Sequence, residues 1–157
     1  MNATRNESCE ARIGAELADV LLTLRRVWAA NQGEPEQPEY DEDGESNPDF
    51  DPSLDGEEAF SEYGLSFDYV APETFGEDQE EGYFRYQLSW GGPSDEFRFY
   101  VSPSRHGFTP HRVEYWFMDW FDGASRRLYG ADRVLLDDIF EWFNELDLQA
   151  MVEAACE

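Results

Sequence analysis

The chain has 157 residues, the size of one ordinary domain, with enough apolar and aromatic residues for a buried core in part of it. Its 36 acidic residues face only 11 basic ones, all arginine, for a formal net charge of -25 at pH 7. A basic partner or bound cations would relieve self-repulsion of this size. We therefore expect no direct binding to nucleic acid or membrane, and a basic protein surface as the partner.

The N-terminal region shows no targeting pattern. The first thirty residues lack a basic segment followed by an unbroken apolar run, and no run of 18 apolar residues occurs in the sequence. We therefore expect neither export nor membrane insertion, and a cytoplasmic protein. Cys9 and Cys156, near opposite ends of the chain, are expected to be reduced thiols.

The first predicted element is a helix over residues 8–32. Ser8 can cap its start, and Gly33 can end it. One helical face is formed by the apolar residues Ile13, Leu17, Val20, Leu21, Leu24, Val27 and Trp28.

Residues 33–62 have a different composition, with thirteen acidic residues, four prolines and no basic residue. Such a segment buries too little apolar surface to offset its ordering entropy. We predict an acidic, mobile loop.

Strand patterns occupy residues 63–130. Apolar and polar residues alternate over 63–69, 84–90 and 97–101, with an acidic turn at 73–82 and a Gly-Pro turn at 91–95. A Pro/Gly loop at 102–110 precedes a strand at 111–121, and Asp122-Gly123 is a turn signal before a return strand. We predict an antiparallel meander of about five strands.

The last predicted element is a helical segment over residues 131–155. Asp132 can cap its start, and Leu135, Ile139, Trp142, Phe143 and Leu146 share one face. The predicted fold is therefore a single α+β domain over residues 1–157, in which an N-terminal and a C-terminal helix pack on one side of the sheet.

The sequence contains two patterns of candidate metal ligands. A calcium-loop spacing is formed by Asn47, Asp49, Asp51, Ser53, Asp55 and Glu58. Pro52 occupies the position that needs glycine, so a solvated acidic tether is favoured. His106 and His111 alone are too few ligands for zinc. No catalytic or phosphate-binding motif is present, and we predict neither an enzyme nor a cofactor.

Acidic residues form two candidate partner-binding patches. Along the last helix, carboxylates recur at a spacing of about 6 Å, like a row of phosphates, at Asp137, Asp138, Glu141 and Glu145. The second patch consists of Glu77, Asp78, Glu80 and Glu81. The alternative is the polar face that any amphipathic helix has.

An aromatic strand offers a different interface. Trp116, Met118 and Trp120 alternate with Tyr115 and Phe117, so both faces of this strand are apolar. Core packing under the helices explains this pattern, and an exposed face would suit a protein partner or a homodimer.

Two stretches resemble segments of small uncharacterised proteins of bacterial plasmids and integrative elements: Trp90-Gly91-Gly92-Pro93-Ser94-Asp95-Glu96-Phe97 and Glu114-Tyr115-Trp116-Phe117-Met118-Asp119-Trp120-Phe121-Asp122-Gly123. This resemblance, over residues 60–146, implies no catalytic residues. In charge, size and acid-striped helix the chain is similar to DNA-mimic proteins of phages and plasmids, including anti-restriction and anti-CRISPR inhibitors.

Three functional hypotheses follow. In the first, the chain is a DNA mimic that binds the basic nucleic-acid-binding surface of a host defence protein or effector complex. In the second, it is an adaptor or regulatory protein whose aromatic sheet face binds the partner, while its acidity provides solubility. In the third, the acidity is a halophilic adaptation, which predicts unfolding without high salt.

Overall fold

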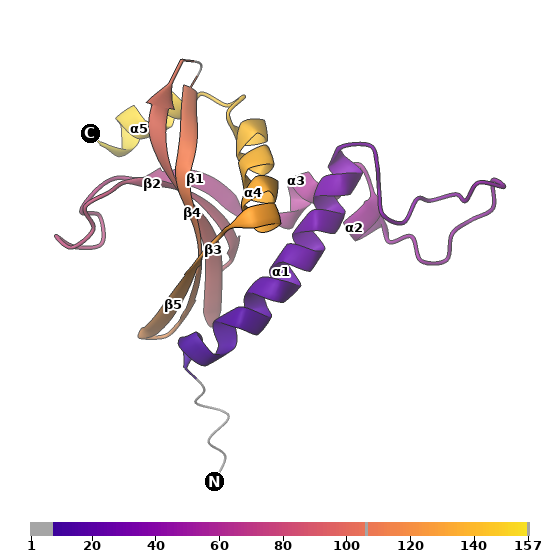
Figure 1. The fold of residues 1–157 in the computed structure, drawn as a ribbon, viewed down its shortest axis with the longest axis horizontal. Coiled ribbons are helices and arrows are strands. Elements are labelled where there is room, and N and C mark those ends of the chain that lie inside the picture. Colours follow the sequence, from indigo (N-terminus) through magenta and orange to yellow (C-terminus); the bar gives the residue numbers. More distant parts are fainter. Residues whose placement is uncertain (1–7, 106, 157) are drawn as a thin grey trace, which may run out of the picture. The chain divides into compact units, whose positions relative to one another are not determined.

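The computed structural model describes residues 8–105 and 107–156, so His106 of the predicted histidine pair lies outside the described residues. Five strands form one antiparallel sheet with the order β1-β2-β3-β4-β5, which confirms the predicted α+β meander (Figure 1). The elements are α1 (Cys9–Asn31), α2 (Pro52–Asp55), α3 (Ala59–Tyr63), β1 (Ser66–Val70), β2 (Tyr83–Ser89), β3 (Pro93–Ser104), β4 (Gly107–Asp119), β5 (Asp122–Arg127), α4 (Gly130–Phe143) and α5 (Leu148–Ala155).

The chain divides into two compact units. The sheet unit comprises Met1–Gly14 and Leu65–Glu157, and the acidic unit comprises Ala15–Gly64. Helix α1 therefore begins in one unit and ends in the other. Each unit is described by itself below.

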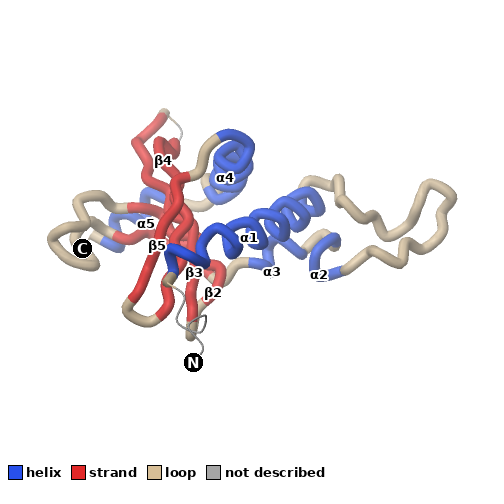
Figure 2. Tube along the Cα trace, turned by 60° about the horizontal axis from the view of Figure 1, so that its bottom comes forward, coloured by secondary structure: helices blue, strands red, loops and turns tan. Residues whose placement is uncertain are grey.

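Helix α4 lies beside the sheet (Figure 2), and the core of the sheet unit is an aromatic cluster between the two. Phe140 lies at its centre, with ring centroids 5.0 Å from Phe99, 5.8 Å from Phe84 and 6.2 Å from Phe67. Phe67 also stacks on Phe143 at 4.0 Å. Alternate strand residues thus cover the face of the sheet that meets α4, which leaves their neighbours on the opposite face, called here the open face.

The prediction of a loop at 102–110 is wrong. Strand β3 continues to Ser104, and β4 already begins at Gly107, so the two form a hairpin. Pro103 pairs in register with Phe108, and Pro110 pairs with Val101. Among the described residues of this stretch, β3 and β4 pair only with each other, because β2 and β5 pair further along them. A proline in such a two-stranded ribbon can direct its missing N–H outward, so it does not break the ladder.

The β4–β5 turn also differs from the prediction. Asp119 pairs with Asp122, so the turn residues are Trp120 and Phe121, and Asp122-Gly123 opens β5. Trp120 has a φ of 59°, a left-handed conformation that is rare for a large side chain.

The first turns of α1 brace this hairpin within the sheet unit. The Asp122 carboxylate accepts a hydrogen bond from the Cys9 backbone N–H at 2.6 Å, which lowers the pKa of Asp122. Arg12 pairs with Asp119 at 2.7 Å and lies over the Phe117 ring, 4.8 Å from its centroid. Ser8 caps α1 as predicted, accepting a hydrogen bond from the Ala11 N–H. Cys9 and Cys156 are both free thiols.

The acidic segment contains more regular structure than predicted. Two short helices, α2 and α3, interrupt it, and Tyr63 ends α3 instead of opening a strand. Asp51 caps α2, Asp55 is buried, and the Phe60 ring meets Trp28 edge-on at 4.9 Å. Apolar anchors and caps therefore hold residues that composition alone assigns to coil. The mobility of the segment stays a prediction.

The C-terminal helical segment is confirmed, with corrected ends. Helix α4 begins at Gly130, so Asp132 lies in its first turn and Tyr129 takes the N-cap position. The helix ends at Phe143, and Asp147 caps α5, accepting from the Ala150 N–H at 3.1 Å. Among the described residues, no helix combines the length and apolarity needed to cross a membrane.

Candidate partner-binding surfaces

The predicted acid row on α4 is only partly formed. Arg133 pairs with Asp137 at 2.8 Å and donates to the Pro110 carbonyl, so the charge of Asp137 is matched. Glu145 lies in the turn beyond the helix, because Asn144 ends it and donates to the Phe108 carbonyl at 3.0 Å. Asp138 and Glu141 are the exposed carboxylates that remain on the helix.

The second predicted patch lies on a well-defined loop. The Gln79 side-chain amide donates to the carbonyls of Ala71 and Glu81 and accepts from the Phe75 N–H. Glu81 pairs with Arg112 at 3.0 Å. Glu77, Asp78 and Glu80 are exposed on this loop and form no ion pair with a described residue.

The three residues of the predicted aromatic interface do not lie on one surface. Trp116 and Met118 lie on the open face and line a cavity. Trp120 lies in the β4–β5 turn beside Phe121, with exposed fractions of 86% and 104%. The exposed aromatic pair is thus Trp120 and Phe121, because the strand ends at Asp119.

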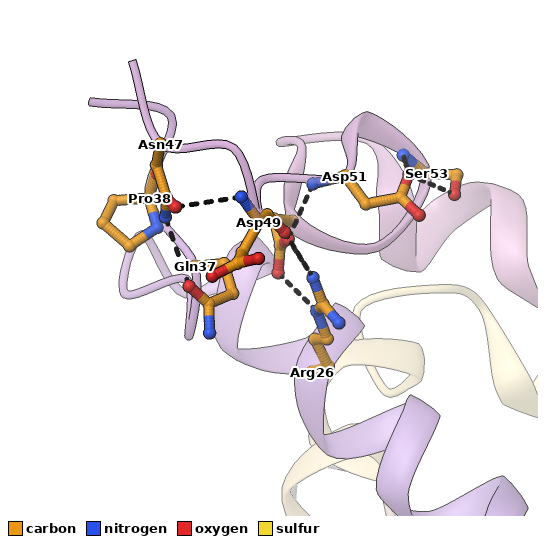
Figure 3. Close-up of polar contacts among 8 residues, drawn as sticks. Arg26, Gln37, Pro38, Asn47, Asp49, Asp51 and Ser53 are labelled. Atoms are coloured by element: carbon orange, nitrogen blue, oxygen red, sulfur yellow. Dashed lines mark hydrogen bonds and ion pairs between the residues drawn. The ribbon is translucent and has the colours of Figure 1, made fainter. Parts of the chain in front are cut away.

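The candidate calcium loop is a network of caps and one ion pair (Figure 3). Arg26 forms two hydrogen bonds to the Asp55 carboxylate, at 2.8 and 2.6 Å, and these bonds lower the pKa of Asp55. Asp51 accepts from the Ser53 hydroxyl and N–H, which lowers the pKa of Asp51. Asn47 caps the Asp49 N–H. Within residues 8–105 and 107–156, no group of three or more His, Cys, Asp or Glu side chains is arranged to hold a metal ion.

The least compensated acids lie in a hairpin that the sequence did not predict. The acidic hairpin, residues 39–47, is closed by a bridge between Tyr40 and Ser46 and by an Asp41 N–H bond to the Glu45 carbonyl at 2.8 Å. Asp41 holds the turn by accepting from the N–H groups of Asp43 and Glu45. All five acidic side chains of the hairpin are exposed, and no described arginine pairs with them: Glu39, Asp41, Glu42, Asp43 and Glu45.

The segment that contains this hairpin runs away from α1 and α2 of its own unit (Figures 1 and 2). Between Arg26 and Arg85 the sequence contains nineteen acidic residues and no basic one. The signal that could have located the hairpin is the Asp41-Glu42-Asp43-Gly44 sequence, a turn pattern in which Gly44 takes a φ of 81°.

The sheet unit contains a cavity of about 660 Å³ on the open face, called here the sheet cavity. The guanidinium carbon of Arg98 lies over two rings, 3.8 Å from the centroid of Trp116 and 4.5 Å from the centroid of Tyr83. Arg112 lies 3.9 Å over the Tyr100 ring. Trp90 and Phe75 also line the cavity, with exposed fractions of 77% and 63%. Neither residue was predicted as part of a site, although Trp90 precedes Gly91-Gly92, a sequence typical of an exposed hairpin turn.

No family model matches the chain, and neither a curated protein nor a solved structure matches it. The resemblance to acidic proteins of mobile elements stays a prediction.

Tyr83, beneath the sheet cavity, is fully buried, and its hydroxyl has no hydrogen-bond partner among the described residues. Burial raises the pKa of Tyr83 to about 12. Because an unpaired buried hydroxyl is unfavourable, we expect Tyr83→Phe to raise the free energy of unfolding by about 1 kcal/mol at pH 7. Since the folded-state pKa lies above the ordinary value of 10.0, the wild type should lose further stability relative to this variant as pH rises above 10.

Urea unfolding at neutral and alkaline pH measures both effects. Tyr115→Phe is the matched control, because the Tyr115 hydroxyl donates to the buried Asp95 carboxylate at 2.6 Å. That variant should lose about 1–3 kcal/mol. Equal destabilisation by the two substitutions would contradict the assignment of Tyr83 as unpaired.

Proposed function

We propose that the protein is an acidic decoy that binds the basic nucleic-acid-binding surface of a partner protein, with carboxylates in place of phosphates. The observation that supports this function best is the acidic hairpin, whose carboxylates are exposed and form no ion pair with a described arginine. The similarity to DNA-mimic proteins suggests a cytoplasmic defence protein, of the restriction or CRISPR type, as the target.

The charge density of the hairpin is comparable to that of a nucleic-acid strand. Residues 39–45 contain five acidic side chains in seven positions. An extended chain advances about 3.3–3.6 Å per residue, and one DNA strand has one phosphate per about 3.4 Å of helix axis. Folding into a hairpin brings these charges closer still, so the local field suits a groove lined with arginine and lysine.

The two patches predicted on the sheet unit fit the same function less well. The charges of Asp137 and Glu81 are matched by arginines, and Glu145 is displaced from the helix. The exposed remainder, Asp138 and Glu141 on α4 and Glu77, Asp78 and Glu80 on the loop, can extend the contact.

The test begins with capture of partners from a bacterial lysate at low salt and elution with double-stranded DNA. Binding of an eluted, purified partner is then compared for the wild type and a variant that combines Glu39→Gln, Glu42→Gln, Asp43→Asn and Glu45→Gln. Asp41 is kept because it holds the turn. We expect affinity to fall at least about tenfold at low salt, and the dependence of log K on log salt to flatten by up to about four units.

The matched control combines Asp138→Asn and Glu141→Gln on α4, which should have a smaller effect. Wild-type affinity in the hairpin variant, or a partner that DNA does not displace, would refute the decoy function.

A second candidate function is an adaptor that uses the β4–β5 turn. Trp120 and Phe121 are exposed, and hydrogen bonds from Arg12 and Cys9 to the flanking aspartates hold the turn. Rigid exposed aromatic residues are common binding hot spots. This function predicts a salt-resistant partner that is lost with Trp120→Ala, while the hairpin variant still binds.

A further inference from the structure

The sheet cavity accommodates guanidinium groups on aromatic rings. Two of its arginines, Arg98 and Arg112, lie within 3.9 Å of the centroids of Trp116 and Tyr100, respectively. Two other rings of the lining, Trp90 and Phe75, are mostly exposed, and no described arginine lies over either of them. The cavity thus combines occupied cation–π positions with free ones.

The arginines of the cavity are neutralised within the sheet unit. Arg85 pairs with Asp68 at 2.7 Å, and Arg98 pairs with the buried Glu96 at 2.8 Å. Arg112 is held by Glu81 at 3.0 Å and by Glu114 at 3.3 Å. The arginines therefore offer little net positive charge to an anionic ligand.

Negative charge remains at the rim. Asp78 and Glu80 line the cavity, are exposed, and form no ion pair with a described residue. They belong to the loop that also supplies Phe75, and the whole chain has a net charge of -25. Free ring faces beside unpaired carboxylates favour a cation.

We propose that the sheet cavity binds an arginine side chain of the basic partner protein. Its guanidinium group stacks on Trp90 or Phe75 and donates hydrogen bonds to Asp78 and Glu80. Arginine fits better than lysine, because a planar guanidinium stacks on rings and carries five N–H donors, whereas an ammonium is a strongly hydrated point charge. The cavity volume of about 660 Å³ lies within the usual range of about 300–1,000 Å³ for ligand sites. The identity of the occupant rests on the proposed function.

The direct test uses N-acetyl-arginine methylamide as the probe, followed by the indole N–H signals of the intact protein in NMR spectra. The five tryptophans provide internal markers, because Trp90 and Trp116 line the cavity, whereas Trp28, Trp120 and Trp142 do not. At moderate salt we expect saturable shifts of the Trp90 and Trp116 signals at millimolar probe, and no shift of the other three. The lysine analogue should bind at least about threefold more weakly.

Variants at the rim test the contacts. Trp90→Ala, and Asp78→Asn combined with Glu80→Gln, should each weaken probe binding at least fivefold, and Trp120→Ala is the matched aromatic control without effect. Unchanged signals from the distant tryptophans verify folding. Absence of saturable shifts, equal binding of the lysine analogue, or stronger binding of adenosine monophosphate or inorganic phosphate at the same signals would overturn the proposal.

The hairpin variant separates this inference from the decoy function. It should retain probe binding in the cavity while losing affinity for the partner. If the partner is displaced by DNA but binds Trp90→Ala with wild-type affinity, the inference fails and the decoy function stands. If the probe binds as expected and the partner resists DNA, the decoy function fails and the cavity remains an arginine site.

Discussion

Phe140→Ala is expected to lower the free energy of unfolding of the sheet unit by about 4 kcal/mol. The Phe140 side chain is fully buried, and its ring lies 5.0–6.2 Å from those of Phe99, Phe84 and Phe67. Its removal leaves a cavity at the centre of the contact between α4 and the sheet. Because domains of this size are stable by about 5–15 kcal/mol in total, this loss is a large fraction of the stability.

Urea unfolding followed by near-ultraviolet circular dichroism measures the change, since the cluster consists of aromatic rings. Phe121→Ala is the matched control, because the same side chain is fully exposed in the β4–β5 turn. We expect that control to change stability by about 0.5 kcal/mol or less. A similar loss in both variants would show that the cluster is not the core of the sheet unit.

Arg26→Ala is expected to destabilise the acidic unit by about 3 kcal/mol, because it leaves the buried Asp55 carboxylate without its bidentate partner. The Asp55 side chain has an exposed fraction of 0%, and it also accepts from the Asp51 N–H, so the pair holds α2 in place. Hydrogen exchange of the amides of residues 49–63 should accelerate most. Urea unfolding gives the total change.

Arg85→Ala is the matched control, because Arg85 also forms a bidentate pair with Asp68, at 3.0 and 2.7 Å, but the Asp68 side chain is 45% exposed. An exposed pair contributes about 1 kcal/mol or less. If Arg85→Ala and Arg26→Ala have the same effect, burial of Asp55 is not the cause.

The same pair predicts a dependence on pH. Arg26 holds the pKa of Asp55 below its ordinary value of 3.8. The stabilisation is therefore complete above that value, and it is lost as the pH falls through the lower folded-state pKa. The difference in stability between the wild type and Arg26→Ala should thus be constant near neutral pH and shrink below pH 3.8.

The sequence predicted the elements wherever a periodic pattern coincided with a buried face. Alternation at Phe84 and Tyr86, and helical spacing at Leu135 and Ile139, correspond to side chains that meet in the core of the sheet unit. The predictions failed where a tertiary contact replaced a local signal. Asn144 ends α4 through its bond to Phe108, and a two-stranded ribbon accommodates Pro103.

The candidate surfaces were harder to predict, because composition counts charges without pairing them. The Arg133–Asp137 pair has the i,i+4 spacing of a helical ion pair and could have been expected from the sequence. Nothing in the sequence indicates that Arg112 neutralises Glu81, or that the acids near Asp41 form no ion pair with a described arginine. Ion pairs across strands and loops depend on the strand register, because a shift of one residue would turn each side chain to the opposite face of the sheet.

The sequence by itself determined the α+β class, the strand order along the chain and the excess of negative charge, since these follow from periodicity and composition. Only the tertiary structure decided which carboxylates are free and which rings are exposed. It brought Trp90 from one hairpin, Phe75 from a loop and Trp116 from a central strand into one cavity. The physical reason is that exposure and pairing are set by contacts between residues far apart in the chain, whereas periodicity reports only local geometry.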